Sequence, residues 1–141
     1  MKIRRLEPED AATAAGAVKL FASEEVSLGY MERFLSDPTT YLIVAELDGE
    51  IAGFVLTYAL RRMKQDDSVK MFIYEIEVAP KHRRKGVGTA LINYVRDIVR
   101  KEKMYSAFVF TNYSNEGAVE FYKSTGAAIE NGDDLLFYYE G

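Results

Sequence analysis

Residues 83–90 read Arg-Arg-Lys-Gly-Val-Gly-Thr-Ala, between a predicted strand at 71–78 and a predicted helix that continues from 91 to 101. A glycine-bearing loop between a strand and a helix is an anion site, because the first helical amides lack partners and the helix dipole favours negative charge. Gly86 and Gly88 remove side chains that would keep a phosphate from these amides. The basic triplet before them adds positive charge, so the loop predicts a phosphate site.

Two better-known phosphate motifs do not fit this loop. A P-loop would place Lys-Ser/Thr after the second glycine, but Gly88 is followed by Thr89 and Ala90. The dinucleotide fingerprint would need a third glycine and an acidic partner in a βαβ unit. A basic turn with a glycine-rich helix start remains the alternative, and the placement between strand and helix favours the phosphate site.

Composition narrows the class of protein. A chain of 141 residues is expected to form one domain, 1–141, with a proper core. It has no long apolar run and no signal-peptide pattern, so we expect a cytoplasmic protein with no membrane partner. With no cysteine and one histidine, His82, a metal site and a cysteine nucleophile are not expected. The net charge of −4 argues against nucleic-acid binding and is compatible with a cationic substrate.

Hydrophobic periodicity, turn residues and caps predict alternating strands and helices, with hairpins near both ends. This order predicts an α+β protein with a mixed sheet and helices on both faces. The predicted helices cover 8–22, with Pro8 in the first turn, 30–35, 86–103 and 115–124. The predicted strands cover 2–6, 41–47, 51–60, 69–78 and 107–110, and a last hairpin joins 127–130 to 135–139.

Two ordered motifs resemble those of the GCN5-related N-acetyltransferase (GNAT) family. Residues 78–88 read Val-Ala-Pro-Lys-His-Arg-Arg-Lys-Gly-Val-Gly, similar to the family's acyl-CoA signature. Residues 115–126, with Asn115, Phe121, Tyr122 and Gly126, are similar to its second motif. The resemblance implies an N-acetyltransferase using acetyl-CoA as co-substrate. It also implies an α/β/α sandwich whose central twisted sheet is splayed at strands 4 and 5.

The resemblance assigns the acetyl-CoA contacts. The pyrophosphate would lie on amides from Arg84 to Thr89, and the pantetheine arm would lie along the fourth strand, on main-chain groups. Asn115 resembles the family's pantetheine contact, although it would equally suit the N-cap of the following helix. The implied contacts are Ile76, Val78, Arg83, Arg84, Lys85, Gly86, Val87, Gly88, Thr89, Asn115 and Tyr122.

Three side chains are candidates for the chemistry. Tyr122 resembles the family's general acid, and a phenol with a pKa of about 10 is a suitable proton donor to a thiolate; the alternative is a core aromatic. Glu75 and Glu77 share one face of a strand, because strand side chains alternate. They are candidates for the general base or for holding a substrate ammonium. Alternatively they face solvent, or one pairs with Arg61 or Arg62.

The sequences at 74–78 and 112–113 resemble those of the type I aminoglycoside 3-N-acetyltransferases and so suggest an acceptor. Those enzymes have Asp-Tyr where this chain has Asn112-Tyr113, and Asn cannot take a proton from an ammonium. A peptide N-terminus, a lysine or a polyamine remain alternative acceptors, as does a non-catalytic acetyl-CoA-binding module, and a homodimer stays open. The expected substrate-side residues are Glu75, Glu77, Asn112, Asp133 and Asp134, with Glu24 and Glu25 adding negative charge.

Overall fold

The computed structural model describes residues 1–141, which form two compact units, Met1–Val109 and Phe110–Gly141. The first unit contains a five-stranded sheet of order β1-β2-β3-β4-β5. Neighbouring strands are antiparallel up to β4, and β5 runs parallel to β4, so the predicted mixed sheet is confirmed. The strands are β1 Lys2–Arg5, β2 Thr40–Leu47, β3 Glu50–Arg61, β4 Val69–Val78 and β5 Ser106–Phe108.

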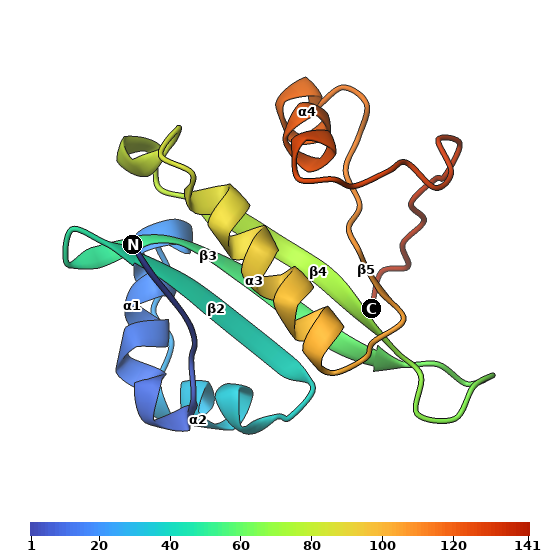
Figure 1. The fold of residues 1–141 in the computed structure, drawn as a ribbon. Helices are drawn as coiled ribbons and strands as arrows, with labels where there is room; N and C mark the ends of the chain where they lie inside the picture. The colour runs from blue at the N-terminus through green and yellow to red at the C-terminus, as the bar shows by residue number, and fades with distance from the viewer. The chain divides into compact units, whose positions relative to one another are not determined.

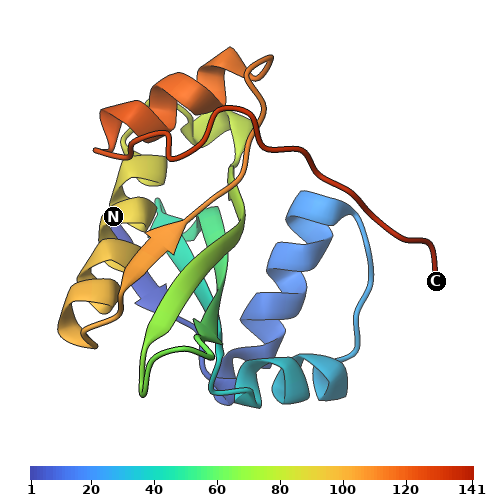
Figure 2. The same ribbon diagram turned by 90° about the vertical axis from the view of Figure 1, so that its right-hand side faces the viewer.

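Helices of the first unit lie on both faces of this sheet (Figures 1 and 2). The helix α3, Val87–Lys101, covers one face, and α1, Ala11–Ala22, and α2, Leu28–Ser36, cover the other. Helix α2 begins two residues before the predicted start, because the hydroxyl of Ser27 accepts a hydrogen bond from the amide of Tyr30 and caps the helix there. No helix is long and apolar enough to span a bilayer.

The α1/α2 face has an apolar core and a polar anchor. Leu6, Ala14, Leu35 and Val44 belong to one buried cluster that joins both helices to β2 and β3.

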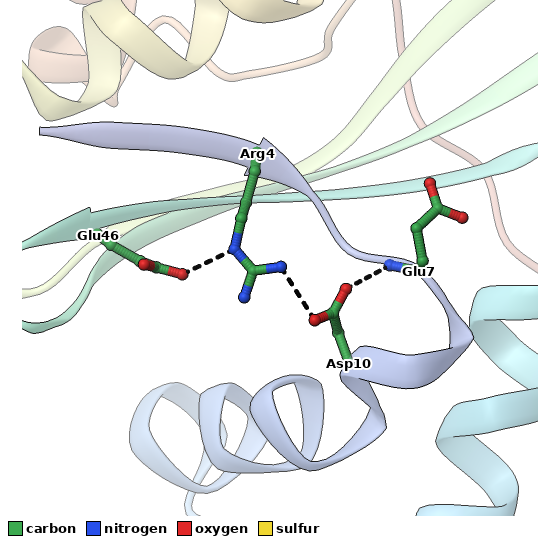
Figure 3. A network of polar contacts seen from close by, with 4 residues as sticks. All are labelled: Arg4, Glu7, Asp10 and Glu46. Carbon is green, nitrogen blue, oxygen red and sulfur yellow. Dashed lines mark hydrogen bonds and ion pairs between the residues drawn. The ribbon is translucent and has the colours of Figure 1, made fainter.

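At the edge of this face, the guanidinium of Arg4 donates to Glu46 on β2 and to Asp10, each at 2.9 Å (Figure 3). The second oxygen of the Asp10 carboxylate accepts from the amide of Glu7 at 2.8 Å. These bonds hold the start of α1 against β1 and β2. The Glu7 amide and then Arg4 lower the pKa of Asp10, while Asp10 and Glu46 raise the pKa of Arg4.

The α3 face is close-packed around a glycine. Val87, Leu91 and Val95 of α3 are fully buried. A β-carbon built on Gly53 of β3 would lie 2.7 Å from the carbonyl oxygen of Glu77 and 3.1 Å from Val87. Glycine at residue 53 therefore allows the first turn of α3 to lie directly on the sheet.

The second unit contains one helix, α4, Glu116–Ser124. Asn115 caps it by accepting from the amide of Ala118 at 3.1 Å, and Gly126 follows it with a φ of 96°, as its sequence predicted.

The predicted hairpin joining 127–130 to 135–139 is wrong, because no strand forms after α4. Asn131 bonds locally to the amide of Asp133, and the apolar side chains of 135–139 are exposed. Strand propensity reflects packing against neighbours, and these residues have no ladder partner in the structure.

Candidate active site

The predicted anion loop lies in the first unit, between β4 and α3. A short 3-10 helix, η2, Pro80–His82, follows β4 and was not predicted. Beyond it, Arg84 and Gly86 have φ values of 61° and 79°, both in the left-handed region. Left-handed residues alternating with others turn successive amides toward one side, which makes a concavity suited to an anion.

The helix start beside this loop is open to a ligand. No side chain caps α3, and the amide of Ala90 makes the first helical bond, to the carbonyl of Gly86 at 3.0 Å. The amides of Val87, Gly88 and Thr89 therefore remain for a ligand. Three basic side chains of the loop are exposed: Arg83, Arg84 and Lys85. Only Arg83 bonds to the protein, since its Nε donates to the carbonyl of Val78 at 3.4 Å. This cradle fits the pyrophosphate of acetyl-CoA.

A buried histidine, His82, connects the loop to the sheet through a contact that no local sequence pattern indicates. His82 is only 2% exposed, and its Nε2 lies 2.9 Å from the carboxylate of Glu50. Lys81 pairs with the same carboxylate at 2.6 Å. Bonds from Lys81 and then from His82 lower the pKa of Glu50. The Nδ1 of His82 is buried with no hydrogen-bond partner. Glu50 begins β3, so these contacts link the loop to the β2–β3 hairpin.

The edge of β4 is open along most of its length. Only Lys70, Met71 and Phe72 pair with β5, so residues 73–78 have no strand partner on that side. This is the predicted splay between strands 4 and 5. The main chain of Ile76 and Val78 lies in the open stretch, where an extended ligand could pair with it as an added strand.

A β-bulge decides where the two carboxylates lie. Leu56 of β3 pairs with Glu75, but its neighbour Thr57 pairs with Ile73, so Tyr74 is the extra residue of β4. A bulge re-aims the side chains that follow it.

Glu75 and Glu77 consequently emerge opposite Leu56 and Phe54, on the α1/α2 face, as a pair sharing one face. Both are exposed, and neither forms an ion pair with Arg61 or Arg62. The side chains therefore face solvent, the alternative of a pair with Arg61 or Arg62 is not observed, and their catalytic role stays a prediction.

The remaining candidates lie in the second unit. Tyr122 is half-buried, its ring centroid lies 5.3 Å from that of Phe121, and burial raises the pKa of its phenol. A raised pKa keeps the phenol protonated at neutral pH, as a proton donor requires. Asn115 fills the N-cap, which is one of its two predicted roles.

The acceptor-side candidates of this unit are exposed: Asn112, Asp133 and Asp134. The carbonyl of Asn112 accepts from the amide of Asn115 at 3.0 Å. A β-carbon at Gly132 would lie 2.5 Å from the hydroxyl of Tyr113, an exposed side chain that would have to move to admit it. The functional roles of these residues stay predictions.

Comparisons with known proteins support the family. The acetyltransferase (GNAT) family pattern matches residues 7–127, which is most of the chain. The chain therefore belongs to the GNAT acetyltransferase family.

Two relatives and one solved structure illustrate the likeness. An uncharacterised N-acetyltransferase of Methanocaldococcus jannaschii is 34% identical over 83 residues, which cover 59% of this chain and 37% of the relative. The streptothricin acetyltransferase of Streptomyces lavendulae is 29% identical over 103 residues, covering 72% of this chain and 51% of the relative. The chain thus spans about a third to a half of the length of these relatives.

The crystal structure of an aminoglycoside acetyltransferase from an uncultured soil metagenomic sample, in complex with trehalose, shares the fold. It superimposes with a TM-score of 0.90 at 24% identity, covering 99% of this chain and 95% of that chain. At this identity the likeness concerns the fold.

Proposed function

We propose that this chain is an acetyl-CoA-dependent N-acetyltransferase that transfers the acetyl group to a primary amine by direct attack, within a single domain of residues 1–141. One observation carries the proposal: an uncapped helix start in a basic loop lies at the end of a strand whose edge is open from Ile73 to Val78. The loop suits a pyrophosphate, and the open edge suits a pantetheine arm.

Main-chain groups of the first unit would bind acetyl-CoA. The amides of Val87, Gly88 and Thr89 hold the pyrophosphate, and the main chain of Ile76 and Val78 aligns the arm. Acetyl-CoA supplies the thioester whose carbonyl carbon the amine nitrogen attacks as the bond to sulfur breaks.

Glu75 or Glu77 takes the proton of the amine, directly or through water, and the phenol of Tyr122 gives a proton to the departing thiolate. Both carboxylates are accessible on the α1/α2 face, and burial keeps the phenol protonated. Asn115 would contact the pantetheine while it caps α4.

For the acceptor we propose an aminoglycoside, with the 3-N position as the first candidate. The sequence resemblance of β4 and of Asn112-Tyr113 to those enzymes supports this assignment. The negative charge expected on the acceptor side, including Asp133 and Asp134, also supports a cationic acceptor. Since Asn112 cannot act as a base, the assignment depends on Glu75 or Glu77.

The test is a screen of amines with acetyl-CoA that measures the release of free thiol. Gentamicin-like aminoglycosides, short peptides, lysine and polyamines form the panel. We expect turnover of the aminoglycosides, a loss of turnover number of about 100- to 10,000-fold in Tyr122→Phe with acetyl-CoA affinity retained, and faster turnover in Asn112→Asp. If acetyl-CoA binds but no amine is acetylated, the chain is a non-catalytic acetyl-CoA-binding module. If only peptides or polyamines are acetylated, the aminoglycoside assignment is wrong and these amines are the acceptors.

A further inference from the structure

The first unit has an open pocket of about 370 Å³ between α2 and the sheet, apart from the loop and from the carboxylates of β4. Its volume is at the lower end of the range for ligand sites, so it suits one ring-sized group rather than a long chain. It is lined by Tyr30, Arg33, Phe34, Asp37, Thr40 and Tyr58.

Aromatic rings form the walls of the pocket and continue out of it. Tyr30 and Phe34 of α2 stack with ring centroids 6.2 Å apart, and Tyr58 of β3 lines the pocket with them. Tyr58 in turn lies 5.7 Å from Tyr74, which stacks on Phe72 at 6.0 Å. Tyr74 is 53% exposed, because α1 and α2 do not cover β4. Aromatic faces therefore extend from the pocket along the sheet.

The polar groups of the pocket are unpaired or only partly used. The guanidinium of Arg33 and the hydroxyls of Tyr30 and Tyr58 make no hydrogen bond within the protein. One carboxylate oxygen of Asp37 accepts from the amide and the hydroxyl of Thr39, at 2.8 and 2.7 Å, which leaves the second oxygen for a ligand. These bonds fix the carboxylate and lower the pKa of Asp37, so it is ionised at neutral pH.

The charges of the pocket are mixed, with one guanidinium and one carboxylate. Burial raises the pKa of the Tyr58 phenol, and the neighbouring Tyr74, Tyr30, Glu75 and Asp37 raise it further. Flat apolar faces flanked by fixed donors and acceptors of both signs suit a ring whose faces are apolar and whose edge carries hydroxyls and an ammonium.

We propose that this pocket binds one amino-sugar ring of the acceptor, other than the ring whose amine is acetylated. The faces of Tyr30, Phe34 and Tyr58 stack on the sugar. Asp37 accepts from its ammonium or hydroxyls, and Arg33 donates to its oxygens. The inference rests on the proposed function and narrows it, because an acceptor with several rings fills this pocket whereas a single-ring amine does not.

The strand register gives the distance that such an acceptor must cross. Tyr58 is two residues beyond Leu56, the partner of Glu75, which corresponds to about 7 Å along β3. Tyr74, the bulge residue between Ile73 and Glu75, has an exposed ring whose centroid lies 5.7 Å from that of Tyr58. An acceptor whose adjacent sugar rings span that distance reaches the pocket with one ring while another presents its amine at the carboxylates.

The experiment compares a three-ring aminoglycoside of the gentamicin type with deoxystreptamine, a single-ring amine. We expect Asp37→Asn to raise the Michaelis constant for the three-ring acceptor about tenfold, because a charged hydrogen bond is lost. Tyr30→Leu and Tyr58→Leu should each raise it several-fold through lost stacking. The Michaelis constants for deoxystreptamine and for acetyl-CoA should stay within about twofold of the wild-type values, as should kcat.

The matched controls are Glu32→Gln, on α2, and Tyr105→Leu, an exposed tyrosine; neither residue lines the pocket. Equal effects on one-ring and three-ring amines, or effects no larger than the controls, would overturn the proposal. Calorimetry with the same amines, without acetyl-CoA, separates this inference from the proposed function. Three-ring binding that depends on Asp37 and Tyr58 supports the pocket even where no thiol is released. If spermidine binds, and its binding depends on Asp37 but on neither tyrosine, the pocket recognises a simple polyamine. That result would overturn the assignment to an amino-sugar ring.

Discussion

The two faces of the sheet are built in different ways. On the α3 face, the helix lies directly over Gly53, with Val87 and Leu91 fully buried beneath it. On the other face, α1 and α2 cover β2 and β3 with an apolar cluster but leave β4 open, so that Tyr74 and Glu75 are exposed. One face is closed around a helix start, and the other offers side chains to solvent.

This difference matches two kinds of recognition. The proposed donor side uses main-chain groups, namely the amides at the start of α3 and the open edge of β4. Main-chain recognition needs a rigid backbone, which the close contact at Gly53 and the buried His82 provide. The proposed acceptor side uses exposed side chains from α2, β3 and β4, so its specificity can change without altering the sheet.

The largest effect is expected on the exposed face. If Glu75 or Glu77 is the general base, glutamine at that residue should lower kcat/KM by about 100- to 10,000-fold and flatten the acid limb of its pH profile. The base accepts a proton only when ionised, so in the wild type the rate should rise with pH along this limb. Each variant is the control of the other, since both carboxylates are exposed on one face. Wild-type profiles in both would show that the amine arrives deprotonated or that another group takes its proton.

On the donor side, Gly88→Glu should weaken CoA binding by on the order of 100-fold, which corresponds to about 2.7 kcal/mol. The new carboxylate would enter the cradle at the start of α3 and repel the phosphates. Calorimetry with CoA measures the loss. Gly16→Glu places the same change on α1, where a β-carbon meets nothing within 4 Å, and should leave CoA affinity unchanged. An unaltered affinity in a folded Gly88→Glu protein would remove the basis of the donor site.

Features that depend on residues adjacent in the sequence, such as turns and helix ends, could be predicted. The predicted strands 41–47 and 51–60 pair as a hairpin, and its turn residues Asp48 and Gly49 have the positive φ values, 55° and 79°, that such a turn needs. The helix predicted at 8–22 forms with its first turn, Pro8–Asp10, as a 3-10 helix and the rest, Ala11–Ala22, as α1. The loop at 83–90 was recognised because glycines and basic residues between a strand and a helix have one common physical use.

Features that depend on partners distant in sequence could not be predicted. The bulge at Tyr74 is set by the pairing of β4 with β3, and the burial of His82 depends on Glu50. The pocket combines Tyr58 of β3 with residues of α2, and no local sequence pattern predicts that these residues lie together. Gly53 did carry a signal, since glycine within a strand often marks close backbone approach, and it was overlooked.

The packing contrast can be tested with one substitution on each face. Gly53→Ala should lower the free energy of unfolding by about 1–3 kcal/mol, because its β-carbon would lie 2.7 Å from the carbonyl oxygen of Glu77. Gly16→Ala, in the middle of α1 with no atom near the new methyl, should instead raise it by about 0.5–1 kcal/mol. Urea denaturation measures both. A neutral Gly53→Ala would mean that α3 is free to move away from the sheet.

The smallest effect concerns the charged anchor of the α1/α2 face. The folded pKa of Asp10 is lowered by the Glu7 amide and by Arg4, so the folded chain binds fewer protons at this carboxyl than the unfolded chain does. Its stabilisation is fully present above the unfolded pKa of about 3.9 and is lost as the pH falls through the lower folded value.

Asp10→Asn should therefore cost about 0.5–1 kcal/mol at pH 7, and the difference from the wild type should shrink below pH 4. Asp97→Asn is the matched control, because Asp97 also pairs with an arginine, Arg100, at 2.9 Å, but both side chains of this pair are largely exposed. It should cost at most a few tenths of a kcal/mol. Urea denaturation at pH 7 and at pH 3 gives the four differences. A cost for Asp10→Asn that does not change with pH would show that the carboxylate anchors α1 by shape alone. The close packing around Gly53 contains no titrating group, so the cost of Gly53→Ala should not follow the same pH dependence.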